Sequence, residues 1–184
     1  GCGWRLLYRM TRDGTDLGRF YARAAGHRCT VLVARSTGGH RFGCFASQAW
    51  SPALSRGVGG GGGGAVKATS PGGTHLASAF GSGHVFGTVR YYGDGETFLF
   101  RLLGAGHCRF YLYTGANALV QYAGPDGLGV GGGGGGFGLY LGEGFLRCTS
   151  NTSATFENEP LAPDAAARDG GAFACAELEL WAVT

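Results

Sequence analysis

The chain of 184 residues lacks the features that would place it in a membrane or on nucleic acid. It has no apolar run near the roughly 20 residues that a membrane span needs, so we expect no membrane insertion. Charged residues make up 15% of the chain, the formal net charge is +3, and its basic residues form no cluster with interleaved aromatics. We therefore expect no nucleic acid among its partners.

The cysteines do not follow the spacing of any common cysteine motif. Six cysteines are widely spaced and form no C-x-x-C pair, which excludes the common redox and zinc patterns. Cys29, Cys44, Cys108 and Cys175 lie in strand-like apolar runs, where free cysteine behaves as a small buried hydrophobe. Because no basic-then-apolar leader follows Gly1, we expect an excerpt of a longer, intracellular protein, either cytoplasmic or nuclear.

Familiar catalytic and ligand motifs are missing as well. There is no G-x-S-x-G elbow, no histidine pair at i, i+4 spacing for a metal, and no Lys-Ser/Thr after the glycine run at 131–136. These absences predict a non-enzymatic protein that needs no metal and no cofactor.

Two residues remain as catalytic candidates. Glu96 shares strand parity with Phe98 and Phe100, so we expect its carboxylate to be partly buried and held by backbone amides or an arginine. Cys148 precedes polar residues and is predicted to be the most exposed thiol. The alternative function is therefore an enzyme or a thiol-based peroxide scavenger that uses Glu96 or Cys148.

What the chain does contain is enough apolar material for one core. Its 39 glycines would suggest low complexity, but 44% hydrophobic and 12% aromatic residues argue against a disordered chain. We predict a single domain over residues 1–184. Residues 55–85 combine glycine runs with small residues and no periodicity, so we expect a mobile insertion there.

The first part of the chain predicts a strand and then a helix. Residues 5–10 form an apolar strand pattern, and Asp13-Gly14 is typical of a turn. A helix is expected over 16–25, with Thr15 as its N-cap and Leu17 and Phe20 on its buried face.

The remainder of the chain predicts strands. Val31, Leu32 and Val33 are consecutive and apolar, so the strand at 29–35 should be central and covered on both faces. Further strands are expected at 40–47, 97–103, 109–113, 119–122, 137–141, 145–148 and 173–181. Short strands separated by turns predict an α+β, mainly β fold: a two-layer antiparallel β-sandwich with a few peripheral helices.

Positive charge gathers early in the chain. Residues 1–41 hold eight arginines against two aspartates. Such asymmetry favours steering toward an acidic protein partner, although arginines on a solvated surface need no function. The arginines that we predict to face a partner are Arg5, Arg9, Arg12, Arg19 and Arg23.

Several blocks, in order, resemble one known family. Trp4 to Leu17 is followed by Gly43 to Trp50, Tyr92 to Leu102, Tyr113 to Ala118, Gly131 to Leu141, Thr155 to Leu161 and Ala176 to Trp181. Together they resemble the TLDc domain, the TBC/LysM-associated domain of oxidation-resistance proteins. Asp94 stands where that family usually has Thr, Glu157 stands where it usually has Gly, and its leading helix is not in this sequence.

The resemblance also indicates which residues form the family motif. These are Gly14, Gly43, Phe45, Gly93, Gly95, Glu96, Phe98, Phe100, Gly115, Asn117, Gly133, Gly134, Gly135, Gly136, Phe137, Gly138, Phe156, Asn158, Glu179 and Trp181. We expect the glycines to serve tight chain crossings and not an anion site. The resemblance implies an intracellular, monomeric interaction domain that binds and regulates the vacuolar proton-pumping ATPase, at endolysosomal membranes through that partner, and protects against oxidative stress.

Overall fold

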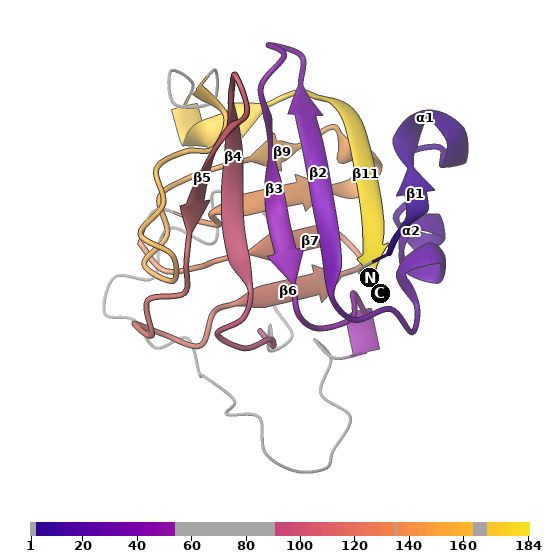
Figure 1. The fold of residues 1–184 in the computed structure, drawn as a ribbon, viewed down its shortest axis with the longest axis horizontal. Coiled ribbons are helices and arrows are strands. Elements are labelled where there is room, and N and C mark those ends of the chain that lie inside the picture. Colours follow the sequence, from indigo (N-terminus) through magenta and orange to yellow (C-terminus); the bar gives the residue numbers. More distant parts are fainter. Residues whose placement is uncertain (1–2, 54–90, 135, 164–168) are drawn as a thin grey trace, which may run out of the picture.

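The computed structural model describes residues 3–53, 91–134, 136–163 and 169–184 and shows two antiparallel sheets packed face to face (Figure 1). The first sheet has the order β1-β11-β2-β3-β4-β5, and the second has the order β10-β9-β8-β7-β6. The predicted mainly β, two-layer sandwich is confirmed. The predicted insertion at 55–85 lies outside the described residues.

The first sheet has six strands, of which β2 and β11 alternate in burial along their length. The six strands are β1 (Trp4–Arg9), β2 (Thr30–Ser36), β3 (Arg41–Ala46), β4 (Phe98–Gly104), β5 (His107–Tyr111) and β11 (Cys175–Val183). In β2, Leu32 and Ala34 are fully buried, whereas Val31 and Val33 are only partly buried. Side chains at even positions of β2 therefore point toward the second sheet, and those at odd positions point away from it.

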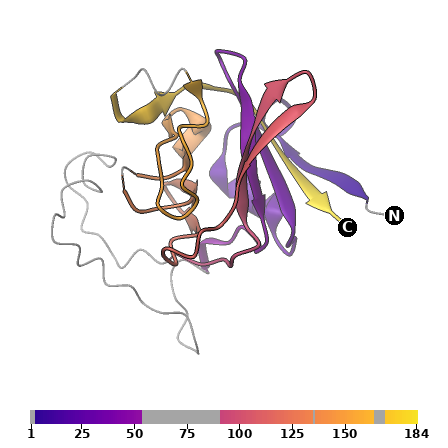
Figure 2. The ribbon, with the colours of Figure 1, turned by 60° about the vertical axis from the view of Figure 1, so that its left-hand side comes forward.

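The second sheet consists of short strands, with every residue of β6 to β8 buried. They are β6 (Gln121–Gly124), β7 (Gly127–Val130), β8 (Leu139–Gly142), β9 (Cys148–Thr149) and β10 (Ala172–Phe173). Its strands run across those of the first sheet (Figure 1), and Figure 2 shows the two layers from the side. Leu99, Leu128 and Leu141 fill the space between them.

Two helices sit at one edge of the sandwich, beside β1 (Figure 1). The predicted helix over 16–25 is α2 (Leu17–Ala24), but its N-cap is Asp16, whose carboxylate accepts from the Arg19 N–H at 2.7 Å. The Thr15 prediction is wrong, and Asp is at least as good as Thr at this position. Phe20 on the buried face of α2 packs edge-on against Tyr8 with ring centroids 5.2 Å apart.

Other local predictions need correction. The strand predicted for residues 5–10 ends at Arg9, and a one-turn helix α1 (Met10–Asp13) takes the place of a simple turn. The strand predicted at 145–148 is instead the 3-10 turn η1 (Glu143–Phe145) followed by β9. The strand predicted at 173–181 is divided between the two sheets. The turn η2 (Asp169–Gly171) is followed by β10, which ends in the second sheet, and the chain then enters the first sheet as β11.

The expectation that β2 is covered on both faces is also wrong. β2 is central, between β11 and β3, and its inner face is buried. However, no element in the described ranges lies over its outer face (Figure 1). The sequence of β2 is therefore as apolar as that of a strand buried on both faces, although only one face of β2 is covered.

Candidate functional site

The outward surface of the first sheet is apolar and open. We define it as the outer face. In register across neighbouring strands, one row of the outer face consists of Leu6, Trp181, Val31, Phe45 and Phe98. The adjacent row begins with the charged pair Arg9 and Glu179 and continues with Val33, Gly43, Phe100 and Phe110, so it is apolar from β2 to β5. Large apolar side chains that gather on a sheet surface are typical of an interaction site.

Aromatic rings give the outer face its shape. The rings of Phe45 and Phe98 are stacked with centroids 5.3 Å apart, and Phe110 contacts Phe98 edge-on at 5.7 Å. Phe110 remains 56% exposed and Trp4 60% exposed. Trp4, Val33 and Trp181 line a shallow pocket of about 300 Å³.

One glycine of the family motif makes this surface possible. Gly43 has no side chain, and the ring of Phe100 occupies the space above it: a Cβ at Gly43 would lie 3.0 Å from Phe100 Cζ and 1.8 Å from the Leu32 carbonyl oxygen. Phe100 is thereby only 7% exposed on an open face. An aromatic ring that covers a neighbouring glycine is a known way to stabilise a sheet.

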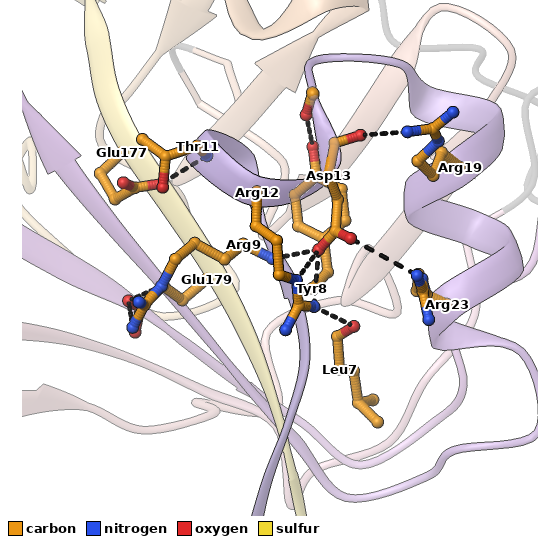
Figure 3. Close-up of polar contacts among 11 residues, drawn as sticks. Leu7, Tyr8, Arg9, Thr11, Arg12, Asp13, Arg19, Arg23, Glu177 and Glu179 are labelled. Carbon is orange, nitrogen blue, oxygen red and sulfur yellow. Dashed lines mark hydrogen bonds and ion pairs between the residues drawn. The ribbon is translucent and has the colours of Figure 1, made fainter.

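The predicted partner-facing arginines lie near α1 and α2, and most of them bind groups of this chain (Figure 3). Asp13 is only 5% exposed; it accepts from the Arg9 N–H at 2.9 Å and pairs with Arg12 at 2.6 Å and with Arg23 at 3.5 Å. Arg19 donates to the Asp13 carbonyl oxygen at 3.1 Å. This cluster ties α1 to α2.

The remaining two arginines are also engaged. Arg9 pairs with Glu179 at 2.7 Å, and Trp181 donates its indole N–H to the other oxygen of Glu179 at 2.8 Å. Arg5 lies 3.1 Å from the His27 ring. The predicted partner-facing arginines therefore have a structural role, because their contacts hold β1, β11 and the helices together.

The Asp13 cluster predicts a pH effect on stability. Hydrogen bonds from the Arg12 side chain, and next from the Arg9 N–H, hold the pKa of Asp13 below its ordinary value. A lowered pKa in the folded state stabilises the protein above the unfolded value of about 3.9, and this contribution is lost as the pH falls through the folded pKa.

We therefore expect Asp13→Asn to lower the melting temperature at pH 7. The difference between wild type and variant should shrink as the pH falls below about 4. Thermal unfolding followed by circular dichroism between neutral and acidic pH measures this difference. A gap that stays constant down to the acid end would contradict the assignment.

The carboxylate that organises the 92–98 segment is Asp94 and not Glu96. Ser47 donates to Asp94 at 2.6 Å, Gln48 at 2.8 Å and the Glu96 N–H at 3.1 Å. Burial opposes ionisation, but these hydrogen bonds together lower the pKa of Asp94. Glu96 is exposed, so the prediction that its carboxylate is partly buried is wrong. Nothing in the local sequence predicts this role of Asp94, because its partners Ser47 and Gln48 lie 47 and 46 residues earlier in the chain.

Cys148 also differs from its prediction. It is 1% exposed in the core and donates its thiol to the Phe145 carbonyl oxygen at 3.2 Å. Its interaction with the Cys175 thiol, and next its burial, raise the pKa of Cys148. A buried thiol with a raised pKa is a poor nucleophile. The polar residues after Cys148 were misleading because Ser150 is itself buried and bonded to Gly138.

We expect native Cys148 to resist alkylation. Its reaction with a thiol reagent at pH 7 should be at least about 100-fold slower than in denaturant, because reaction requires local opening. Mass spectrometry of timed samples measures the rate, with the partly exposed Cys108 as internal control. If Cys148→Ser abolished rapid stoichiometric consumption of peroxide, the scavenger alternative would regain support.

In the glycine run, residues 131–133 cross very close to the segment at 153–156. Gly131 has a positive φ of 75°, and a Cβ there would lie 2.7 Å from Ser153 Oγ and 2.8 Å from a ring carbon of Phe156. The Gly132 N–H donates to Thr155 Oγ1 at 2.9 Å, and Gly133 accepts from the Ala154 N–H at 3.1 Å. Gly133, Gly134 and Gly136 also have positive φ, whereas Gly135 lies outside the described residues.

Two asparagines of the family motif hold this crossing. Asn117 accepts from the Leu119 N–H and from the Thr155 hydroxyl, both at 2.8 Å. Asn158 is buried, donates to Asn151 and Glu159 carbonyl oxygens at 2.8 and 3.0 Å, and accepts from the Ser153 hydroxyl at 2.6 Å. Both side chains therefore bind this chain's own backbone and hydroxyl groups.

The other motif residues also occupy structural positions. Gly14, Gly93 and Gly115 have positive φ. A Cβ at Gly95 would meet the Tyr113 ring, and Gly138 packs against Leu99. The ring of Phe137 covers Gly129, and Phe156 is buried.

Glu157 has a φ of 48°, a conformation that costs a non-glycine residue about 1–2 kcal/mol. That strain explains why this position favours the glycine that is usual in the family.

The geometry thus defines a two-sheet antiparallel β-sandwich with one open apolar sheet face. The chain matches the family model of the TLDc domain over residues 2–63 and 73–184, and it belongs to the TLDc domain family.

Individual relatives agree with the family match. The chain is 27% identical over 186 residues to Oxidation resistance protein 1 of Yarrowia lipolytica and 29% identical over 188 residues to that of Eremothecium gossypii. Each match covers 98% of this chain and 63% of the relative. The protein of the same name from Podospora anserina is 28% identical over 223 residues, which cover 98% of this chain and 53% of that protein. The chain therefore spans less than two thirds of the length of these relatives.

Proposed function

We propose that this chain is a non-catalytic protein-interaction domain that acts in protection against oxidative stress. Membership of the TLDc family and the names of the relatives support the link to oxidation resistance. The observation that carries the interaction role is the outer face, because β2 has the apolar sequence of a strand covered on both sides and leaves one side open. The partner would supply that cover.

The proposed partner assembly is the vacuolar proton-pumping ATPase, as the family resemblance implies. In that role the domain acts inside the cell and reaches endolysosomal membranes through its partner. In the described part of the chain, no helix has the length and apolar character needed to cross a bilayer. The domain would regulate the assembly by binding to it through a surface of complementary shape and charge, and not by catalysing a reaction.

Affinity capture of the full-length parent from its native cell, with and without oxidant, tests this proposal. We expect proton-pump subunits among the captured proteins, and survival in peroxide should fall when the parent is deleted. Capture without pump subunits would refute the assignment of the partner. Unchanged survival would refute the protective role.

A further inference from the structure

We propose that the outer face binds an amphipathic helix of a partner protein, with the apolar side of the helix on the aromatic rows and acidic residues along one flank facing Arg35 and Arg41. This inference rests on the proposed function as an interaction domain and names the surface and the partner's chemistry. It follows from the size of the apolar rows, from the charge beside them and from two pockets.

The size of the apolar area fits one helix. The longer apolar row spans five strands, and four steps of about 4.8 Å between strands make about 19 Å, the length of a helix of about 13 residues. The two apolar rows lie two residues apart along each strand, so with their side chains they form a band about 10 Å wide, close to the diameter of a helix. A helix that crosses the strands would contact the band along its full length.

A positive edge runs along one side of this band. Arg35 and Arg41 are exposed and directly opposite each other in the pairing of β2 with β3. Like charges in opposite positions destabilise a sheet, and neither arginine has an ion pair with a residue in the described ranges. Glu177, the other register neighbour of Arg35, already accepts from the backbone N–H groups of Thr11 and Leu178. An acidic flank on the partner would offset this repulsion.

The same charges disfavour a second copy of this chain as the occupant. Two copies stacked face to face would need a carboxylate for each arginine, and the outer face offers Glu177 and Glu179. Glu179 is bound to Arg9 and Trp181, and Glu177 to backbone amides. Self-association would therefore bury arginines without partners, which is costly.

One pocket lies at the β1 end of the band and a second lies along its positive side. At one end, Trp4, Val33 and Trp181 form the shallow apolar pocket described above, which suits an aliphatic or aromatic side chain. Beside the positive edge, a pocket of about 400 Å³ between the β2–β3 and β4–β5 connections is lined in part by His40, Arg41 and His107. This second pocket suits a carboxylate.

A peptide titration tests the inference on the 184-residue chain. The probe is a designed 18-residue helical peptide with a leucine stripe flanked on one side by glutamates. Trp4 and Trp181 lie on the outer face, while Trp50 is buried and contributes a constant signal. We expect saturable binding with a blue shift of tryptophan fluorescence, and affinity at least about 10-fold weaker for the same peptide with lysines in place of the glutamates.

Matched variants separate the outer face from general stickiness. Phe110→Ser and the double variant Arg35→Glu with Arg41→Glu should each weaken binding by about 10-fold or more. Leu146→Ser should leave it unchanged, because Leu146 is 82% exposed but lies beside the second sheet. The charge-reversed variant should in turn prefer the lysine peptide. This reversal does not depend on whether Phe110→Ser folds.

Each remaining outcome overturns the inference. Equal binding of both peptides, a dimer that Phe110→Ser abolishes, or preferential binding to anionic lipid vesicles would each identify a different occupant. If the wild-type parent captures pump subunits and the variants capture them equally well, the docking site is wrong and the proposed function stands. If the wild-type parent captures none, the proposed function itself fails.

Discussion

Replacing Gly43 by alanine is expected to destabilise the domain by about 3–5 kcal/mol, at the upper end for single substitutions. The added Cβ would lie 1.8 Å from the Leu32 carbonyl oxygen and 2.9 Å from its carbon. Both are backbone atoms of the paired strand β2, so no side-chain rotation relieves the contact. The strands β2 and β3 would have to separate at the centre of the first sheet.

Thermal and denaturant unfolding measure this effect. A loss of this size should lower the melting temperature by about 10 °C in a domain of this length. Gly18→Ala is the matched control, since Gly18 lies on the exposed side of α2 and its Cβ would approach no backbone atom, only the Asp16 carboxylate that caps the helix, at 3.2 Å. In a helix, Gly→Ala stabilises by up to about 1 kcal/mol. Equal melting temperatures for the two variants would refute the close approach at Gly43.

The second large effect is expected at Asn158. Asn158→Ala removes two donated bonds and one accepted bond in a buried crossing, and leaves the Asn151 carbonyl and Ser153 hydroxyl without their partner. Unsatisfied buried groups cost about 1–3 kcal/mol each, so we expect a total loss of about 2–4 kcal/mol.

The isosteric variant Asn158→Asp sharpens this prediction. Aspartate keeps the acceptor for Ser153 but places a second oxygen against the Asn151 and Glu159 carbonyl oxygens, which repel it. It should therefore be at least as destabilising as alanine at pH 7, despite its native size and shape. Ser153→Ala, which removes one bond of the three, should cost less than either. A stable Asn158→Asp variant would show that the amide donors are not needed.

The sequence predicted the sandwich because apolar periodicity and turn residues are local signals. It missed β7, whose Gly127 and Gly129 weaken the strand pattern. In the fold, Tyr140 and Phe137 cover these two glycines with their rings, so the stabilisation comes from residues outside the strand itself. No reading of β7 alone contains that information.

The candidate site was predictable to a smaller extent. The motif glycines were predicted to serve backbone geometry, and the structure places those that it describes at crossings and turns. Glu96 was expected to be partly buried and Cys148 to be exposed, and both expectations are wrong because the burial of a single side chain depends on the packing of other elements. The outer face was present in the sequence as the apolar run in β2, but its open side became visible only in the fold.

Site-specific crosslinking in the full-length parent tests the central claim most directly. A photoreactive residue at Leu112, which is 66% exposed beside the outer face, and one at Leu146 give a matched pair. Binding through the outer face predicts crosslinks from position 112 to a helical, acidic segment of the partner and few from position 146. Crosslinks to the partner from position 146, with none from position 112, would contradict the account.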